Sequence, residues 1–236
     1  MLKNRWPGWA MQGGGGFNPN SIANLMAWWK ADSGLTIVPA TSFHWLDKIG
    51  GKDLAQTTGG LVPTTTTVNG KLAPVGDGVD DFVQAAFTLV PPYTLFYIVR
   101  QLTASANACQ IGGANGGVTS GIFFGTRPNT DVRLFLSGAA EIDALGTDAL
   151  INTTYIYSGS TSGTAQNLRT SGVNRASGAS VASTDAAGIR LFCTGSGTTF
   201  ANCAIPEVLL YSRVLTDPEK LQVERYAAAG WGAACA

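Results

Sequence analysis

Two acidic residues on one candidate strand mark the first place where this sequence could do chemistry. Glu141 and Asp143 are separated by one residue, and because side chains alternate along a strand, both carboxylates would point to the same side. Glycoside hydrolysis uses such a pair as general acid and nucleophile. Leu145 takes the next alternate position, where a further carboxylate would complete the pattern. We therefore interpret the pair as a solvated loop or edge, and glycosidase activity is disfavoured.

Other catalytic arrangements are also incomplete. The single histidine, His44, lies in a strand-like stretch and is expected to pack there as a neutral side chain, without the partners of a Ser-His-Asp triad. The glycine-rich run 112–117 falls between candidate strands rather than before a helix, so it does not predict a phosphate site. The sequence predicts that the chain is not an enzyme and has no catalytic residue and no cofactor.

An acidic cluster raises the question of a metal. Asp77, Asp80 and Asp81 lie in one glycine-containing turn, and carboxylate oxygens are the ligands that Ca²⁺ prefers. Three carboxylates on a turn can equally accept backbone N–H groups and fix the bend. We favour this second interpretation, so no metal site is predicted.

The four cysteines do not predict a zinc site. Cys109, Cys193, Cys203 and Cys235 contain no Cys-x-x-Cys pair, and the chain has one histidine. Cys193 and Cys203 flank a turn at 195–197 and could form a disulfide across a hairpin in oxidising surroundings. Buried free thiols are the favoured interpretation.

Composition limits the possible partners. Charged residues make up 13% of the chain and 15 basic residues balance 15 acidic ones, so no patch for nucleic acid is expected. No apolar run is long enough to span a membrane. The first residues lack the continuous apolar stretch of a secretory signal peptide, which predicts a chain that starts its life soluble in a cytoplasm.

Short strands and one helix must position any site. Six β-favouring runs are separated by Gly, Asn, Ser and Thr clusters: 93–100, 121–125, 132–136, 154–158, 165–169 and 189–193. In the alternating run 25–31, one of Trp28 and Trp29 should lie in the core and the other nearer the rim. Near the C-terminus, a strand at 207–211 precedes a helix that Thr216 and Glu219 start as a capping box. Gly230 is expected to cap the helix end at about residue 229.

Five segments in a fixed order carry a family resemblance. They are L-M-A-W-W-K-A-D-S-G-L-T at 25–36, W-L-D-K-I-G-G-K-D-L at 45–54, G-D-G-V-D-D-F-V at 76–83, E-V-L-L-Y-S-R-x-L-T-x-x-E at 207–219 and Y-x-x-x-G-W-G at 226–232. The chain resembles concanavalin A-like, laminin-G-like jelly-roll domains of the kind found in bacteriophage structural proteins. The resemblance implies an all-β fold, a two-sheet antiparallel sandwich with a short C-terminal helix. Relatives can carry calcium at the rim, and Pro206 departs from the pattern but suits an edge or strand start.

The length fits one sandwich with an added arm. Residues 1–20 are interpreted as an extended N-terminal arm and residues 21–236 as the sandwich. The arm carries Trp6, Trp9, Met11 and Phe17, which are predicted to bind a capsid or tail protein of the same particle, with packing onto the chain itself as the alternative. This predicts a non-catalytic structural protein that decorates or cements a phage-type virion, located in that virion and possibly a homo-oligomer.

A carbohydrate-binding adhesin, or a receptor-binding tail or fibre component, is the alternative function, and a glycoside hydrolase is a remote one. Candidate groups for a surface glycan are an aromatic for stacking and loop amides for hydrogen bonds. They are Tyr155, Tyr157, Asn107, Asn115 and Asn129. The two tyrosines share one strand face, so packing within the sheet is the simpler interpretation of both.

Overall fold

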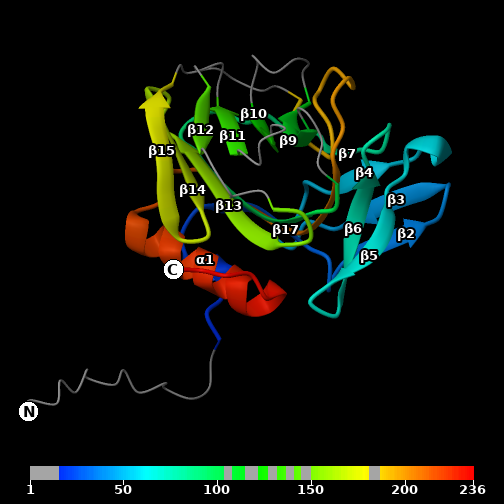
Figure 1. The fold of residues 1–236 in the computed structure, drawn as a ribbon, viewed down its shortest axis with the longest axis horizontal. Coiled ribbons are helices and arrows are strands. Elements are labelled where there is room, and N and C mark those ends of the chain that lie inside the picture. The colour runs from blue at the N-terminus through cyan, green and yellow to red at the C-terminus, as the bar shows by residue number, and fades with distance from the viewer. Residues whose placement is uncertain are drawn as a thin grey trace, which may run out of the picture.

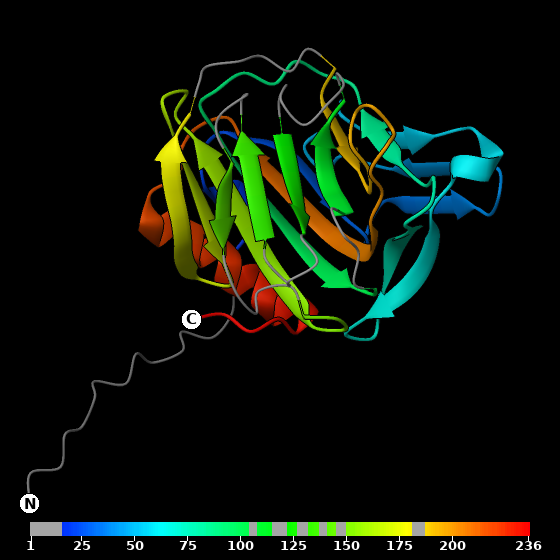
Figure 2. The ribbon, with the colours of Figure 1, turned by 45° about the horizontal axis from the view of Figure 1, so that its top comes forward.

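Two antiparallel sheets lie face to face, and one helix covers the outer side of one of them (Figures 1 and 2). The computed structural model describes residues 16–103, 108–114, 122–126, 132–136, 141–144, 150–180 and 187–236. The all-β sandwich with a short C-terminal helix is therefore confirmed. Residues 1–15 lie outside the described residues, so the extended arm and the boundary at residue 20 stay predictions.

The first sheet has the order β15-β14-β13-β8-β17-β6-β5, with β1 also paired to β17. Its strands are β1 (Leu25–Lys30), β5 (Thr64–Val68), β6 (Lys71–Asp77), β8 (Tyr93–Gln101), β13 (Thr154–Thr161), β14 (Ala165–Thr170), β15 (Val173–Ala179) and β17 (Asn202–Tyr211). The Ser- and Thr-containing end of β13 was interpreted from the sequence as part of a separating loop. It continues the strand instead, because its backbone pairs with β8 as far as Thr161.

The second sheet has the order β12-β11-β10-β9-β16-β7-β4-β3-β2. Its strands are β2 (Leu35–Val38), β3 (Ser42–Trp45), β4 (Leu54–Gln56), β7 (Val83–Ala85), β9 (Ala108–Gly113), β10 (Ile122–Thr126), β11 (Val132–Leu136), β12 (Ile142–Ala144) and β16 (Ile189–Leu191). All six β-favouring runs of the sequence are strands. Two 3₁₀ turns, η1 (Pro19–Ser21) and η2 (Gly59–Leu61), complete the loops.

Strand β17 lies in the middle of the first sheet and has three neighbours. It pairs with β8 along one edge, while β1 and β6 share its other edge. The register with β8 shifts between Ala204 and Glu207, and Pro206 lies within this irregularity. The expectation of an edge strand or strand start for Pro206 is wrong: a bulge in a central strand accommodates the missing N–H, and the Pro206 carbonyl accepts the Ala31 N–H at 2.9 Å.

The main core lies between the two sheets, where the inward side chains of both meet. Trp29 and Trp45 are fully buried in it, together with Tyr97 and Phe124, whose rings meet edge to face at 5.0 Å. Trp28 points the other way along β1 but is buried as well, in a second cluster with Phe96 and Leu209. The prediction that one tryptophan would lie near the rim is wrong, because α1 covers the outer side of β1 and β17.

The helix α1 (Asp217–Trp231) begins at the predicted capping box, in which Thr216 donates its backbone N–H to Glu219 Oε2 at 2.8 Å. It ends two residues later than predicted. The left-handed cap residue is Gly232, with φ of 68°, whereas Gly230 lies inside the helix. No helix in the described part of the chain is long and apolar enough to cross a bilayer.

One buried carboxylate on β17 links the second cluster to the main core. Glu207 accepts the indole N–H of Trp28 at 2.6 Å and that of Trp231 at 2.5 Å, and the Tyr226 hydroxyl at 3.0 Å. Burial raises the pKa of Glu207, and these donors oppose the rise. The network fixes the position of α1 on the sheet, which in turn positions the helix N-terminus described below.

Candidate functional site

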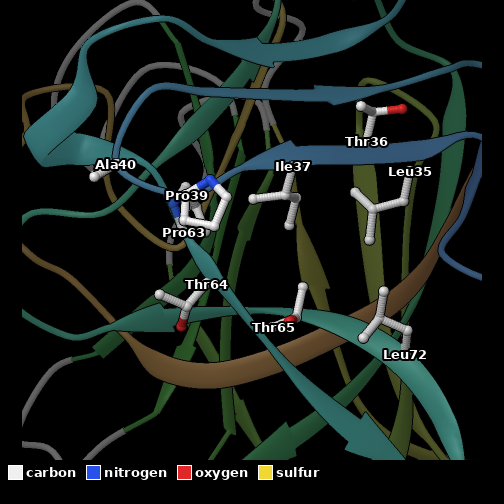
Figure 3. A pocket seen from close by; sticks show the side chains of 9 residues that line it. All are labelled: Leu35, Thr36, Ile37, Pro39, Ala40, Pro63, Thr64, Thr65 and Leu72. Atoms are coloured by element: carbon white, nitrogen blue, oxygen red, sulfur yellow. The ribbon is translucent and has the colours of Figure 1, made fainter.

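Two of the grooves on the described surface differ in the chemistry of their lining. The first, which we call the apolar groove, is about 520 Å³ and lies where the edge strand β2 faces the edge strand β5 (Figure 3). Its lining is aliphatic, with three threonines: Leu35, Thr36, Ile37, Pro39, Ala40, Pro63, Thr64, Thr65 and Leu72. Its side chains offer the three threonine hydroxyls for hydrogen bonds, and none of the described lining residues is charged.

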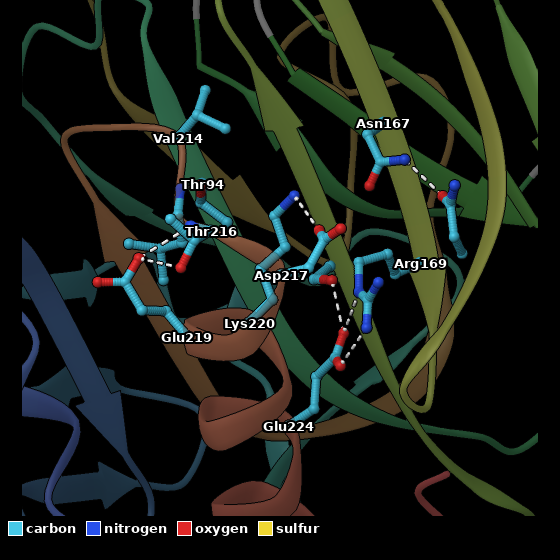
Figure 4. Close-up of polar contacts among 12 residues, drawn as sticks. Thr94, Asn167, Arg169, Val214, Thr216, Asp217, Glu219, Lys220 and Glu224 are labelled. Carbon is cyan, nitrogen blue, oxygen red and sulfur yellow. Dashed lines mark hydrogen bonds and ion pairs between the residues drawn. The ribbon is translucent and has the colours of Figure 1, made fainter.

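The second groove, which we call the polar groove, is about 310 Å³ and lies between the β13–β14–β15 end of the first sheet and the start of α1 (Figure 4). Besides Ala165 and Val214, it is lined by residues with amide, hydroxyl, carboxylate or ammonium groups: Ser160, Ser162, Gln166, Asn167, Asn174, Ser177, Asp217 and Lys220. A few convergent polar groups in a concave site are what a ligand pocket requires.

The strand side of the polar groove follows from the alternation along β14. Leu168 points inward to the core, so Asn167 and Arg169 point outward, toward the side that carries α1. A tight turn at Ser171 and Gly172, both with positive φ, returns the chain into β15 and brings Asn174 beside Asn167. The Asn167 amide donates to Asn174 Oδ1 at 2.5 Å and to the Ala176 carbonyl at 3.2 Å.

The helix side is held by two anchors. Thr94 Oγ1 on β8 accepts the Leu215 N–H at 3.0 Å and donates to the Arg213 carbonyl at 2.8 Å, which fixes the turn before α1. Glu219 in the capping box is paired with Arg213 at 2.6 Å. Hydrogen bonds from Arg213 and Thr216 lower the pKa of Glu219 to about 2, so this carboxylate is ionised at all ordinary pH values.

Beside the polar groove, a buried ion pair joins α1 to the first sheet. Arg169 Nε lies 3.0 Å from Glu224 Oε1, and Arg169 Nη2 lies 3.0 Å from Glu224 Oε2. Ser158 also donates to Glu224, at 3.0 Å, and Arg169 donates to the Gly172 carbonyl at 2.8 Å. The hydrogen bonds to Glu224 raise the pKa of Arg169. Each member of this pair is satisfied, so it locks α1 to β13 and β14.

At the helix start, Asp217 and Lys220 stand one turn apart and face the groove together. The Lys220 side chain is only 7% exposed, and its Nζ lies 3.4 Å from Asp217 Oδ1, whereas the Asp217 side chain is 80% exposed. Figure 4 shows Asn167 on β14 across from these two residues. A donor-only group and an acceptor-only group therefore stand side by side at one wall.

The predicted partner-binding residues are described only in part. Trp6, Trp9 and Met11 lie outside the described residues, so their role stays a prediction. Phe17 is half-buried and its ring meets Tyr226 of α1 edge to face at 6.0 Å. The packing of Phe17 onto its own chain shows how the start of the described chain is attached to α1.

The predicted glycan candidates are described only in part. Asn107, Asn115 and Asn129 lie outside the described residues. Tyr157 is buried between the sheets against Tyr97, and Tyr155 stacks on Tyr157 with centroids 5.8 Å apart. The simpler interpretation of both tyrosines, packing within the sandwich, is confirmed.

The acidic turn after β6 fixes the backbone. Asp77 Oδ1 accepts the N–H groups of Val79 and Asp80, and Asp81 Oδ2 accepts the Asp77 N–H. The ligand oxygens of the three aspartates lie within 4.8 Å of one another. Burial and the charge of Asp77 raise the pKa of Asp81 to about 6. The predicted structural role is confirmed for Asp77 and Asp81, whose carboxylates accept these backbone N–H groups.

The prediction for His44 is wrong, and the prediction for Cys193 and Cys203 is confirmed. His44 was expected to pack as a neutral side chain within its strand, but it is exposed on β3 and its Nε2 lies 3.1 Å from Asp53 Oδ2. The alternation of β3 explains this, because Phe43 and Trp45 take the inward positions. Cys193 and Cys203 are buried free thiols, as favoured; burial raises the pKa of Cys193 to about 11 and also raises that of Cys203.

Sequence reasoning missed the polar groove. Its residues come from a strand, a hairpin and a helix start that lie about fifty residues apart in the chain, so no local motif contains them. The one local signal was the polar alternation of Asn167 and Arg169 around Leu168. That pattern identifies an outward polar face but not the helix that lies against it.

Comparison with known proteins rests on structure. No protein-family model matches the sequence, and no curated protein is similar to it. Trypanosoma rangeli sialidase superimposes with a TM-score of 0.62 and 12% identity over 90% of this chain and 34% of the sialidase. Domain 4 of AbnA, a GH43 extracellular arabinanase from Geobacillus stearothermophilus, in complex with arabinotriose, gives 0.62 and 14% over 86% of this chain and 98% of that domain. The botulinum neurotoxin serotype G binding domain gives 0.60 and 11% over 89% of this chain and 54% of its own.

These likenesses show a shared β-sandwich fold. This chain spans about a third of the sialidase chains, so it corresponds to one part of them, whereas it matches nearly the whole of the arabinanase domain. At 11–14% identity, no functional residue carries over from one protein to another.

The comparison overturns the prediction that this chain is not an enzyme. That prediction rested on the incomplete carboxylate pattern at Glu141 and Asp143, yet solved chains that share the fold belong to a sialidase and an arabinanase. The physical reason is that a sandwich is a scaffold, so an incomplete motif on one strand does not exclude chemistry elsewhere. Glu141 and Asp143 lie at β12, the edge strand of the second sheet, and Leu145 lies outside the described residues.

Proposed function

We propose that this chain is a carbohydrate-binding β-sandwich, of the concanavalin A-like class, whose ligand occupies the polar groove. The observation that carries the proposal is the convergence of amide, hydroxyl, carboxylate and ammonium groups from three strands and one helix on a groove of about 310 Å³. Sugars present many hydroxyls that both donate and accept hydrogen bonds, so such a mixed lining suits them better than the apolar groove does.

A second observation supports the proposal. The arabinanase domain that this chain matches over 98% of its length was solved in complex with arabinotriose. A separate domain of this fold and size is thus able to hold a saccharide. The support is at the level of fold, and the choice of groove comes from the lining described above.

The test is saccharide binding by the full chain and by groove variants. Wild type, Asn167→Ala and Asn174→Ala would be screened on a glycan array, and the binding constants of positive ligands would be measured by calorimetry. Thr65→Ala, in the apolar groove, is the control. We expect both asparagine variants to weaken binding about tenfold and the control to bind like wild type. Binding that is lost in Thr65→Ala but kept in the asparagine variants would place the ligand in the other groove.

A role on a virus-type particle is a second, separate proposal. We propose that residues around Trp6, Trp9 and Met11 attach the sandwich to a capsid or tail protein of the same virion, where it would act as an adhesin or a decoration protein. What supports this is the aromatic content of the segment, together with the resemblance of the sandwich, residues 25–232, to domains of phage structural proteins. The contact of Phe17 with Tyr226 would place such an attachment beside α1.

A further inference from the structure

The wall of the polar groove formed by α1 carries a pair of groups whose hydrogen-bonding capacity is not used up. Lys220 Nζ has three donors, and its one bond to protein within the described residues is the contact of 3.4 Å to Asp217. A buried ammonium with so few partners carries a desolvation cost that a ligand acceptor would relieve. Lys220 is the fourth residue of a helix whose start is fixed by the capping box, so its position is set by the backbone.

Asp217 complements Lys220. Its carboxylate only accepts hydrogen bonds, and 80% of the side chain is exposed, so its oxygens are open to a ligand. The two charges are adjacent and cancel, and none of the other lining residues that the structure describes is charged. A ligand with its own negative charge would meet Asp217 as well as Lys220, whereas a neutral ligand meets no repulsion.

Two neighbouring hydroxyls match this pair. Each hydroxyl carries one donor and two acceptor sites, so the carboxylate can accept both protons while the ammonium donates to one of the oxygens. All of these bonds are charge-assisted and so stronger than bonds between neutral groups. We propose that Asp217 and Lys220 form the specificity-determining subsite for a vicinal diol of a neutral saccharide, an inference that rests on the proposed function.

The opposite wall completes the contact. Within the described residues, neither the Asn167 carbonyl oxygen nor the Asn174 amide nitrogen bonds another protein group, so one acceptor and one donor remain for the rest of the sugar ring. None of the described lining residues is aromatic. Recognition therefore rests on hydrogen bonds rather than on stacking, and removing a single hydroxyl should have a large effect.

The experiment titrates full-length protein with methyl β-galactopyranoside, methyl α-mannopyranoside and methyl α-arabinofuranoside, each beside monodeoxy analogues that lack one ring hydroxyl. Amide chemical shifts in nuclear magnetic resonance give the dissociation constants. The variants are Asp217→Asn, Lys220→Gln and Lys220→Arg. Asp80→Asn is the matched control, because it makes the same carboxylate-to-amide change on a turn outside the groove.

We expect Asp217→Asn and Lys220→Gln each to weaken binding of at least one neutral glycoside about tenfold, while Lys220→Arg and Asp80→Asn retain it. Wild type should bind the analogue that lacks the contacted hydroxyl about tenfold more weakly than the parent glycoside. Asp217→Asn should bind the two with similar affinity, because the hydroxyl and the carboxylate contact each other and removing either one removes the same interaction. If Lys220→Gln does not fold, the exposed Asp217 variant alone gives this result.

Three results would overturn the inference. Unchanged affinity in both Asp217→Asn and Lys220→Gln, with binding lost in Asn167→Ala, would remove the diol subsite and leave the proposed function standing. Tighter binding of methyl glucuronide than of any neutral glycoside, strengthened further in Asp217→Asn, would assign the wall to an anionic ligand. Absence of binding to every saccharide by wild type would remove both the inference and the proposed function.

Discussion

At the scale of single residues, buried charged side chains determine how the stability of this protein changes with pH and with substitution. Asp81 has its pKa raised to about 6 by burial and by Asp77, against an ordinary value of 3.8. The folded state therefore binds this proton more tightly than the unfolded state does. The stabilisation is fully present below about pH 4 and is lost as the pH rises through about 6.

We expect Asp81→Asn to be more stable than wild type at pH 7.5 and to differ little from it at pH 4. The amide oxygen can still accept the Asp77 N–H, and no charge has to be buried. The full pKa difference corresponds to roughly 3 kcal/mol, and solvent near the turn reduces the expected gain to about 1–2 kcal/mol. Urea unfolding at both pH values measures it. The same difference at pH 4 and pH 7.5 would show that the charge is not the cause.

Removing one charge of the Arg169–Glu224 pair should destabilise the protein, in contrast to removing the charge of Asp81. Arg169→Met would leave the Glu224 carboxylate buried without its cation, so the free energy of unfolding should fall by about 3–5 kcal/mol. The double variant Arg169→Met, Glu224→Leu should recover most of this loss, because an apolar contact replaces the ion pair. Chemical denaturation of the three proteins gives the comparison. A single variant within 1 kcal/mol of wild type would mean that water reaches Glu224.

At the scale of elements, the ends of α1 show how far local sequence determines structure. Its start was predicted correctly from Thr216 and Glu219, because a capping box is made by residues three apart. Its end was not, since two glycines, Gly230 and Gly232, can both end a helix. Packing decides between them: Trp231 must stay helical for its indole to reach Glu207 at 2.5 Å.

Substituting the two glycines tests this account. Gly230→Ala lies inside the helix with open space around the new methyl group, so it should raise the free energy of unfolding by about 0.5–1 kcal/mol. Gly232→Ala takes a positive φ of 68° and brings the methyl carbon to 2.9 Å from the Asn69 side chain, so it should lower stability by about 1 kcal/mol or more. Thermal unfolding measures both. The reverse result, with Gly230→Ala less stable and Gly232→Ala more stable than wild type, would identify Gly230 as the cap.

At the scale of the whole molecule, the buried core of the described residues begins at Ile22. We expect a chain that lacks residues 1–15 to unfold within a few degrees of the full chain, because its sheets, its core and the Phe17 contact are kept. If the particle proposal holds, this truncated chain should no longer co-sediment with its assembly. Sedimentation of both chains with purified particles is the measurement, and equal incorporation would exclude the attachment through Trp6, Trp9 and Met11.

The sequence was sufficient for the fold and insufficient for the site. Alternating apolar runs and ordered motifs identify strands and a sandwich, because each depends on residues close together in the chain. The position of Pro206 and the burial of Trp28 depend on neighbours far away, and both were predicted wrongly. The polar groove is a further case: Asn167, Asp217 and Lys220 meet only because the Arg169–Glu224 pair holds α1 against β14.

The place of β17 in the first sheet also has a consequence for how the chain folds as it leaves the ribosome. β17 is synthesised after every other strand that the structure describes, yet it supplies the neighbour of β1, β6 and β8 at once. Until Tyr211 has emerged, β8 keeps an open apolar edge, and the sheet cannot close. The first sheet can therefore form only after β17 has been synthesised, and we expect folding to be slow, because chains dominated by long-range strand pairs fold slowly and expose unpaired strands in the interval.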